Sequence, residues 1–212
     1  MRCPFDELFL KYDRWYDEPF GRSAYALELG CLRELVGRCE RALEVGVGTG
    51  RFAASLGIRF GIDPSENMLR VAKGRGITVV RGVGESLPFR EKSFELVLLV
   101  ATLCFVSDPL GVLREARRVL KGGGKLVLGL ILKESSWADF YMKKASSGHP
   151  IYEIARFYSM GEVREMLSDA GFRIVKVLST LIAEPQDTRP VERSSTVEGT
   201  HPHAGFTCIS AA

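Results

Sequence analysis

Three alternate glycines follow an acidic residue in the segment Glu44-Val-Gly-Val-Gly-Thr-Gly50, directly after a short apolar run. Because glycine lacks a Cβ atom, the chain can turn sharply here and let a flat ligand lie against bare backbone. A helix that begins after Gly50 would present unpaired amides, which attract a carboxylate or a phosphate. Glu44 would attract a cationic amino group. The segment therefore predicts a site for both charges of an amino-acid zwitterion, built from Glu44, Gly46, Val47, Gly48 and Gly50.

A second carboxylate, Asp63, lies 13 positions beyond Gly50 and follows the next apolar segment, residues 58–62. At the tip of a strand beside a glycine loop, a carboxylate can accept hydrogen bonds from both hydroxyls of a ribose. Two structural alternatives stay open at this point. The glycines could serve only the packing of a strand on a helix, and Asp63 could cap a helix over residues 65–73. The spacing differs from the G-x-G-x-x-G of dinucleotide-binding proteins, which disfavours a nicotinamide-dependent reductase.

A parallel α/β sheet with helices on both faces is predicted to position these residues, because segments typical of strands alternate with segments typical of helices. The expected strands after the first are 58–62, 77–81, 93–100, 125–131, 172–181 and 205–210, and the expected helices are 5–17, 23–37, 65–73, 108–120 and 159–171. Ser159 and Glu162 form a predicted capping box, and residues 184–203 are predicted to be irregular. Ligands are expected at the carboxyl ends of the strands.

Composition indicates one globular domain of 212 residues, with 46% hydrophobic and 26% charged residues. The net charge is only +3 and the basic residues are scattered, so an obligatory nucleic-acid partner is not expected. An apolar run long enough for a membrane span and a signal-peptide core are both missing, which favours a cytoplasmic protein. Five cysteines without a C-x-x-C pair are expected to be free thiols. A single Asn and a single Gln suggest a thermophilic source.

Four segments together resemble the Rossmann-like (class I) S-adenosylmethionine-dependent methyltransferases, in the branch with small-molecule substrates. They are Glu44-Val-Gly-Val-Gly-Thr-Gly50, Gly61-Ile-Asp-Pro-Ser65, Gly84-Glu-Ser-Leu-Pro-Phe89 and Leu113-Arg-Glu-Ala-Arg-Arg-Val-Leu-Lys-Gly-Gly-Gly124. The resemblance covers about residues 12–177 and implies a seven-stranded, mostly parallel sheet whose last strand, here 207–210, lies antiparallel between the fifth and sixth. It divides the single domain 1–212 into a helical cap (1–40), a cofactor-binding core (41–133), a substrate-side insertion (134–160) and a C-terminal helix and strands (161–212).

The same resemblance implies which residues bind S-adenosylmethionine and its product S-adenosylhomocysteine. Glu44 and the loop Gly46–Gly50 would hold the methionine part, and Asp63 would hold the ribose hydroxyls. The remaining cofactor contacts would come from Pro64 and Met68 beside the adenine, Gly84 and Glu85 at its edge, and Ala101 near the methionine end. Val83 departs from the family, because many relatives have an Asp there that pairs with the adenine amino group. The adenine contacts would then come from backbone amides or Glu85.

The methyl acceptor is expected to be a small molecule, and the candidate residues for its pocket are Tyr12, Trp15, Cys104, Arg156, Tyr158 and His203. Core packing is the alternative for the aromatic residues, an inert buried thiol for Cys104, and a surface salt bridge for Arg156. His149, His201 and His203 lack partners at ligand spacing, so no metal is assigned. The sequence identifies no catalytic base. A protein that binds S-adenosylmethionine without transferring its methyl group is the main functional alternative, and the chain is expected to be a monomer or a homodimer.

Overall fold

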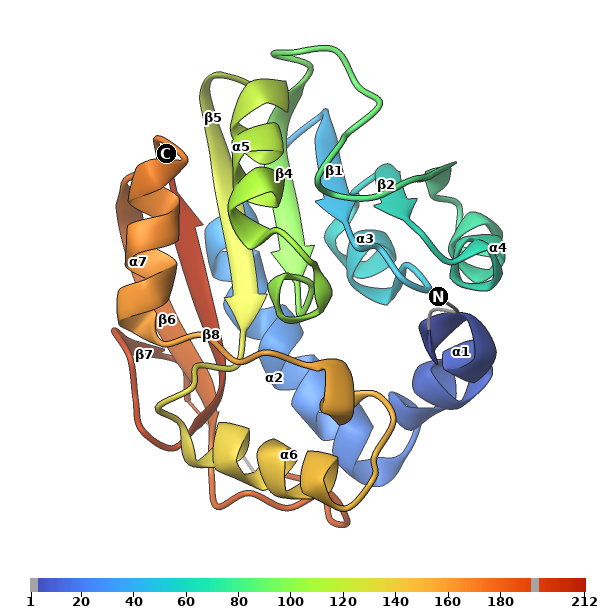
Figure 1. The fold of residues 1–212 in the computed structure, drawn as a ribbon, viewed down its shortest axis with the longest axis vertical. Helices are drawn as coiled ribbons and strands as arrows, with labels where there is room; N and C mark the ends of the chain where they lie inside the picture. The colour runs from blue at the N-terminus through green and yellow to red at the C-terminus, as the bar shows by residue number, and fades with distance from the viewer. Residues whose placement is uncertain (1–3, 192–194) are drawn as a thin grey trace.

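The computed structural model describes residues 4–191 and 195–212 and consists of one sheet with helices on both faces (Figure 1). The helices are α1 (Pro4–Trp15), α2 (Pro19–Val36), α3 (Arg51–Leu56), α4 (Glu66–Gly74), α5 (Pro109–Val119), α6 (Ser136–Ser146) and α7 (Met160–Asp169), with 3-10 turns η1 (Leu103–Phe105) and η2 (Tyr152–Ile154). The strands are β1 (Ala42–Val45), β2 (Phe60–Asp63), β3 (Thr78–Arg81), β4 (Phe94–Val100), β5 (Leu120–Leu130), β6 (Ile174–Ile182), β7 (Val197–Glu198) and β8 (Ala204–Ala211).

The strand order is β3-β2-β1-β4-β5-β8-β6-β7, and the first five strands of the chain are parallel. β8 lies between β5 and β6 and is antiparallel to both, as the family resemblance implies for residues 207–210. The described part of the chain contains eight strands rather than the predicted seven. The additional strand β7 has two residues, too few for a recognisable alternation of side chains, and it lies in the segment 184–203 predicted to be irregular.

β5 begins five residues earlier than predicted, at Leu120 instead of Lys125. Leu120 pairs with Phe94, and regular pairing resumes at Lys125 opposite Leu96 after an irregularity in register. The intervening glycines lie between the predicted helix 108–120 and the predicted strand 125–131, and Gly123 has a positive φ of 76°. The chain therefore bulges within the strand rather than before it.

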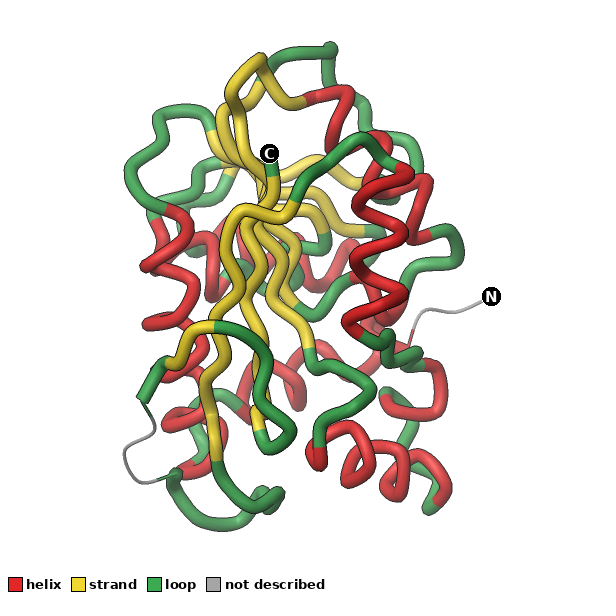
Figure 2. The backbone as a smooth tube through the Cα atoms, turned by 90° about the vertical axis from the view of Figure 1, so that its left-hand side faces the viewer, coloured by secondary structure: helices red, strands yellow, loops and turns green. Residues whose placement is uncertain are grey.

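Helices cover both faces of the sheet and enclose two apolar cores (Figure 2). Val112, Leu113 and Ala116 of α5 pack on one face with Val163 and Leu167 of α7. The other face is covered by α2, α3 and α4, whose packing residues include Leu32, Leu35, Phe52, Leu69 and Ala72. β4 lies between these layers, and Leu96, Val97 and Leu98 are fully buried. Burial on both faces explains why this strand is a continuous apolar run.

Local capping fixes where two helices begin. The predicted capping box is present at α7: the Ser159 side chain accepts from the Glu162 amide, and the Glu162 carboxylate accepts from the Ser159 amide. Asp108 caps α5 by accepting from the Gly111 amide at 2.9 Å. Such caps satisfy amides that have no partner inside the helix.

The order of the strands reverses between the neighbours β1 and β4. From β1 the chain builds β2 and β3 toward one edge of the sheet, and from β4 it builds β5 toward the other edge. In open parallel sheets, ligands bind at the carboxyl ends of the strands beside such a reversal. α1 and α6 lie beyond these carboxyl ends (Figure 1). Within residues 4–191 and 195–212, every helix is too short or too polar to cross a membrane.

Candidate active site

The glycine loop leaves β1 at the point where the sheet reverses direction. The amides of Gly46 and Val47 both donate to the Ile62 carbonyl, which holds the loop on β2. Gly46 has a φ of 72°, and a Cβ atom there would lie 2.6 Å from Thr102 Cγ2, so only glycine fits. The buried Thr102 hydroxyl lies 3.1 Å from the Val45 carbonyl and 3.0 Å from that of Val100. The ends of β1 and β4 are therefore held together beside bare backbone.

Glu44 is buried under this loop, with 2% of its surface exposed. Its Oε2 atom has no hydrogen-bond partner among the described residues. Burial raises the pKa of the Glu44 carboxyl well above its usual range; a hydrogen bond from the Ala53 amide opposes this and the charge of Asp63 adds to it. A buried carboxyl oxygen without a partner is costly, and a cationic ligand would compensate for that cost.

Asp63 lies at the carboxyl end of β2 and faces the same loop. Its Oδ2 accepts from the Gly48 amide at 2.9 Å, and its Oδ1 accepts from the Ser65 amide at 2.9 Å. Burial raises the pKa of Asp63, while these two amides oppose the shift. Ser65, rather than Asp63, caps α4 by accepting from the Met68 amide. Asp63 therefore braces the glycine loop, and each oxygen keeps a lone pair for a further donor.

The other predicted cofactor residues surround this loop at differing depths. Met68 is buried with its sulfur beside Gly48, whereas Pro64 is exposed. Gly84 is buried against Val45 and Val112. The Glu85 carboxylate accepts from the amide and hydroxyl of Ser107, at 3.1 and 3.0 Å, and so orders the approach to α5. Its predicted contact with adenine would then use backbone atoms.

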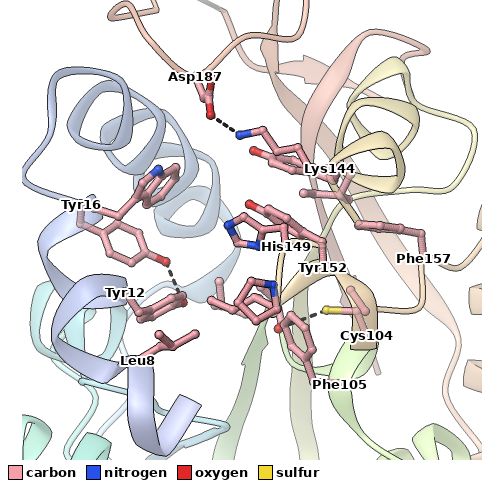
Figure 3. Close-up of a pocket in the computed structure, with 18 of the residues that line it drawn as sticks. Leu8, Tyr12, Tyr16, Cys104, Phe105, Lys144, His149, Tyr152, Phe157 and Asp187 are labelled. Atoms are coloured by element: carbon pink, nitrogen blue, oxygen red, sulfur yellow. Dashed lines mark hydrogen bonds and ion pairs between the residues drawn. The ribbon is translucent and has the colours of Figure 1, made fainter. Parts of the chain in front are cut away.

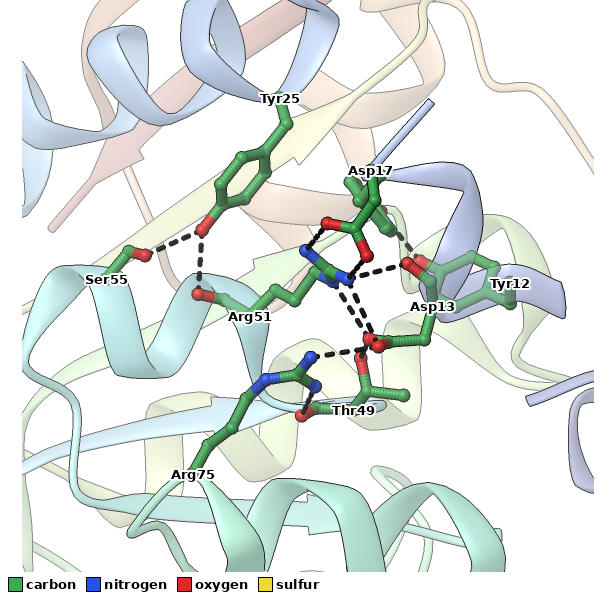
Figure 4. Close-up of polar contacts among 9 residues, drawn as sticks. Tyr12, Asp13, Asp17, Tyr25, Thr49, Arg51, Ser55 and Arg75 are labelled. Atoms are coloured by element: carbon green, nitrogen blue, oxygen red, sulfur yellow. Dashed lines mark hydrogen bonds and ion pairs between the residues drawn. The ribbon is translucent and has the colours of Figure 1, made fainter. Parts of the chain in front are cut away.

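α1 is attached to the glycine loop through Asp13 (Figure 4). The Asp13 carboxylate accepts from the Thr49 hydroxyl at 2.6 Å, from Arg51 Nε at 2.9 Å and from Arg75 Nη2 at 2.9 Å. Arg75 also donates to the Thr49 carbonyl, and Arg51 is shared with Asp17. Because Thr49 and Arg51 flank Gly50, this network fixes the helix directly over the loop. The N-terminal helix α1 is thus joined to the glycine loop by side chains.

A second attachment joins the beginning of α1 to α4. Asp6 accepts from the Ser65 hydroxyl at 2.7 Å, and the Asn67 side-chain amide donates to the Asp6 carbonyl at 2.9 Å. The Ser65 hydroxyl and the Asn67 backbone amide, which donates to the same carboxylate at 3.3 Å, lower the pKa of Asp6. α1 is therefore anchored near both of its ends, to the segments that follow β1 and β2.

A cavity of about 240 Å³ lies between α1, α2, α6 and the carboxyl end of β4 (Figure 3). Three of the predicted acceptor residues line it: Tyr12, Trp15 and Cys104. Ala101, predicted to lie near the reacting end of the cofactor, also lines it and has a strained φ of 48°. Cys104 donates to the Ala101 carbonyl, and burial raises the pKa of its thiol to about 12. Cys104 is thus a neutral wall residue rather than a thiolate nucleophile at neutral pH.

The polar groups of the cavity are contributed by helices and turns distant in sequence. Tyr12 and Tyr16 are hydrogen-bonded through their hydroxyls at 2.9 Å. Lys144 and Asp187 form an ion pair (Figure 3). His149 packs against the ring of Tyr152 with centroids 4.5 Å apart, and burial lowers the pKa of its imidazole. His149 Nδ1 is buried without a hydrogen-bond partner among the described residues.

The structure separates the other three predicted acceptor residues from this cavity. Arg156 and Tyr158 line an adjoining pocket of about 40 Å³, which shares four residues with the larger one: Ala101, Cys104, Ile131 and Phe157. The Arg156 guanidinium lies 4.8 Å from the centre of the Tyr158 ring. His203 is exposed, and its Nδ1 lies 3.3 Å from the Ser136 hydroxyl oxygen. These three residues are not among those that line the larger cavity.

Sequence analysis missed Glu28, which projects into the larger cavity from α2. It lies between Tyr25 and Leu32 at helical spacing, so it is an acidic residue on an apolar stripe of the predicted helix 23–37. That break in the apolar stripe was the available signal. Tyr141, Tyr152 and Lys144 were missed because they come from segments whose position over the sheet is set by tertiary packing.

Cys31, Cys39, Cys104 and Cys208 are free thiols, and Cys3 lies outside the described residues. A search of the described ranges for three or more clustered His, Cys, Asp or Glu side chains suited to a metal ion finds none.

Comparison with known proteins relates the chain to one enzyme family. A family model described as a methyltransferase domain matches residues 43–128, from β1 to β5. An uncharacterised protein of Mycobacterium tuberculosis is 45% identical over 201 residues, which make up 94% of this chain and 70% of that protein. Demethylmenaquinone methyltransferase of Tropheryma whipplei is 36% identical over 200 residues, covering 82% of this chain and 83% of that enzyme.

A solved structure extends the similarity to almost the whole chain. The crystal structure of an S-adenosylmethionine-dependent methyltransferase from Thermotoga maritima, described as a possible histamine N-methyltransferase, is 38% identical in sequence. The similarity covers 98% of this chain and 97% of that one, with a TM-score of 0.90. The shared region therefore includes the segments that form α1 and α6 as well as the sheet.

Proposed function

The chain belongs to the S-adenosylmethionine-dependent methyltransferases, and we propose that it transfers the methyl group to a small molecule bound in the aromatic cavity. The observation that carries the proposal is the position of this cavity. Its wall includes Val100 and Ala101 at the end of β4, which Thr102 holds against the glycine loop. The cofactor loop and the cavity thus meet at one point of the sheet.

The residues around the loop fit the chemical groups of S-adenosylmethionine. The partnerless Glu44 oxygen and the glycine backbone suit the ammonium and carboxylate of the methionine part. Asp63 suits the ribose hydroxyls, and buried Met68 offers an apolar surface to the adenine. We assign the remaining cofactor contacts to Val47, Pro64, Gly84, Glu85 and Ala101, as the family resemblance implies.

The enclosed cavity favours a small acceptor. Its volume of about 240 Å³ accommodates a compact organic molecule, and its aromatic walls exclude water from the reacting atoms. S-adenosylmethionine supplies a methyl group already activated by a positively charged sulfur. The protein then has to place a nucleophile in line with that methyl group and, where needed, accept a proton. Glu28 and His149 are the titratable cavity residues suited to that second task.

Calorimetric titration tests the cofactor assignment. We expect the full-length protein to bind S-adenosylmethionine and S-adenosylhomocysteine but not NADH. Asp63→Ala should weaken the binding of S-adenosylhomocysteine by at least about tenfold, because hydrogen bonds to a charged group are worth roughly 1.5–3 kcal/mol. The matched control is Asp169→Ala, an exposed carboxylate on α7, which should bind like the wild type.

A methyl-transfer assay tests the acceptor assignment. Protein incubated with S-adenosylmethionine carrying a radiolabelled methyl group and a small-molecule extract should place the label in the small-molecule fraction. Label in protein or nucleic acid would contradict the proposal. Binding of S-adenosylhomocysteine with no transfer to any fraction would favour a protein that binds the cofactor as a sensor or subunit.

A further inference from the structure

Glu28 is an unpaired carboxyl in an otherwise largely aromatic and apolar cavity. It is half-buried on α2 and lines the cavity, yet it has no hydrogen-bond or ion-pair partner within residues 4–191 and 195–212. Burial raises its pKa to about 7. A carboxyl removed from water without a partner is unfavourable, and a bound cation would relieve that cost.

Aromatic rings surround this carboxyl. Tyr12, Tyr16, Tyr141 and Tyr152 all line the cavity and lie close enough to Glu28 for its charge to raise their pKa values, in addition to the main effect of burial. Trp15 and Phe157 complete the wall. Aromatic faces attract ammonium groups through their negative π surface, whereas they offer no such stabilisation to an anion.

The remaining charged groups of the cavity do not neutralise Glu28. Lys144 is paired with Asp187. Lys11 is exposed to solvent, and His149 is held toward its neutral form because burial lowers its pKa. Glu28 is thus left as the carboxylate of the cavity that lacks a cation.

We propose that the acceptor is a compact amine, bound as its ammonium form with Glu28 as counter-ion and the tyrosine rings around it. This inference rests on the proposed methyltransferase function and specifies its substrate class. The substrate class follows from Glu28 and the aromatic rings of this chain.

Every proton and bond in the methylation of such an amine can be accounted for at this site. The ammonium group gives one proton to the Glu28 carboxylate, which can act as a base near neutral pH. The nitrogen lone pair then bonds to the methyl carbon while the carbon–sulfur bond breaks and its electron pair stays on sulfur. The products are the N-methylated ammonium ion and S-adenosylhomocysteine, and the proton on Glu28 passes to solvent.

Calorimetry with matched probes tests the inference. 2-Phenylethylamine and 2-phenylethanol have similar shapes but differ in charge, and each is titrated into full-length protein saturated with S-adenosylhomocysteine. In the wild type the amine should bind at least about tenfold more tightly than the alcohol. Glu28→Gln should reduce that ratio to about twofold or less. Glu34→Gln, an exposed carboxylate on the same helix, should keep the wild-type ratio.

Measurements of melting temperature and of amine affinity at different pH values distinguish amine recognition by Glu28 from a structural role of this residue. Glu28→Gln should keep or raise the melting temperature, because it removes a carboxyl that has no partner. Amine affinity in the wild type should fall as the pH is lowered from about 8 to 6 and Glu28 becomes protonated, and it should change less in Glu28→Gln. Lys11, Lys144, Asp187, His149 and the four tyrosines face the same cavity, so the difference between the two proteins is the quantity to compare.

Two results would overturn the inference: an amine that binds wild type no better than the alcohol, or an amine preference that survives Glu28→Gln. Failure of the proposed function has a different signature. If S-adenosylhomocysteine does not bind, or binds independently of Asp63, the methyltransferase site is wrong while an amine preference measured without it still reports on Glu28. If cofactor binding depends on Asp63 but no amine preference exists, the methyltransferase proposal stands and the amine assignment falls.

Discussion

Replacing Asp13 by Asn should loosen the attachment of α1 to the glycine loop and destabilise the protein. The Asp13 carboxylate accepts hydrogen bonds from Thr49, Arg51 and Arg75, and its side chain is only 17% exposed. An amide at this position loses the negative charge and turns an N–H group toward an arginine. The change therefore weakens several charge-assisted hydrogen bonds at once.

The expected loss of stability depends on the hydrogen bonds that Arg51 and Arg75 keep in Asp13→Asn. Breaking a buried ion pair costs roughly 3–5 kcal/mol. Arg51 keeps Asp17 and Arg75 keeps the Thr49 carbonyl, so we expect about 2–3 kcal/mol for Asp13→Asn. For a domain of this length, that corresponds to a fall in melting temperature of roughly 4–12 °C.

The matched control is Asp17→Asn, since Asp17 contacts the same Arg51 but is 62% exposed. Exposed ion pairs are worth about 0–1 kcal/mol, so the control should melt close to the wild type. Differential scanning calorimetry measures both variants, and calorimetric titration should show weaker binding of S-adenosylhomocysteine to Asp13→Asn alone. Melting of the two variants within about 2 °C of each other would refute the assigned role of Asp13.

The difference in stability between wild type and Asp13→Asn should change with pH in one direction. Burial favours a higher pKa for Asp13, but hydrogen bonds from Arg51, Arg75 and Thr49 outweigh it and hold the pKa well below the usual range. The stabilisation is therefore fully present above the unfolded-state pKa of about 3.9 and is lost as the pH falls below it. The stability gap between wild type and Asp13→Asn should narrow below about pH 4.

Three further substitutions test the glycine loop, the packing of the sheet and the buried carboxyl of Glu44. Gly46→Ala should cost about 2–4 kcal/mol in urea unfolding, because its Cβ would overlap Thr102 at a positive φ; a cost below about 1 kcal/mol would show that the loop can move. Gly129→Ala should cost about 1–3 kcal/mol, because the new Cβ would lie 3.0 Å from Cε1 of the buried Phe206, and an unchanged denaturation midpoint would contradict that packing. Glu44→Gln should weaken the binding of S-adenosylhomocysteine by about tenfold. The wild type should lose stability as the pH is raised, because the folded-state pKa of Glu44 lies above its unfolded value of about 4.3, and Glu44→Gln should not show this loss. Parallel melting curves for wild type and Glu44→Gln from pH 5 to 8 would contradict the last of these.

Local patterns were sufficient wherever neighbouring residues alone determine the structure. The capping box of Ser159 and Glu162 forms as predicted, because both its hydrogen bonds lie within one helical turn. Asp63 occupies the tip of β2 beside the glycine loop, because strand alternation and the parallel rule bring consecutive strand ends together. The bulge in β5 and the short strand β7 were mispredicted, because both depend on the strand that lies alongside.

The structure brings only part of the predicted acceptor set into one cavity. Tyr12, Trp15 and Cys104 line the cavity, whereas Arg156, Tyr158 and His203 do not. The packing of α6 and η2 over the sheet determines this division, and no local pattern encodes it.

The sequence by itself determined the family, the cofactor and the form of the glycine loop, because the Glu44-to-Gly50 motif and Asp63 depend on backbone turns and strand ends that their own neighbours specify. Tertiary structure alone decided which side chains share the cavity between α1, α2 and α6. Glu28 from α2, Tyr141 from α6 and Tyr152 from η2 are far apart in the chain, and they meet only because three separate elements pack against one end of the sheet. A contact between distant segments depends on how whole helices pack, and that is a property of the complete fold.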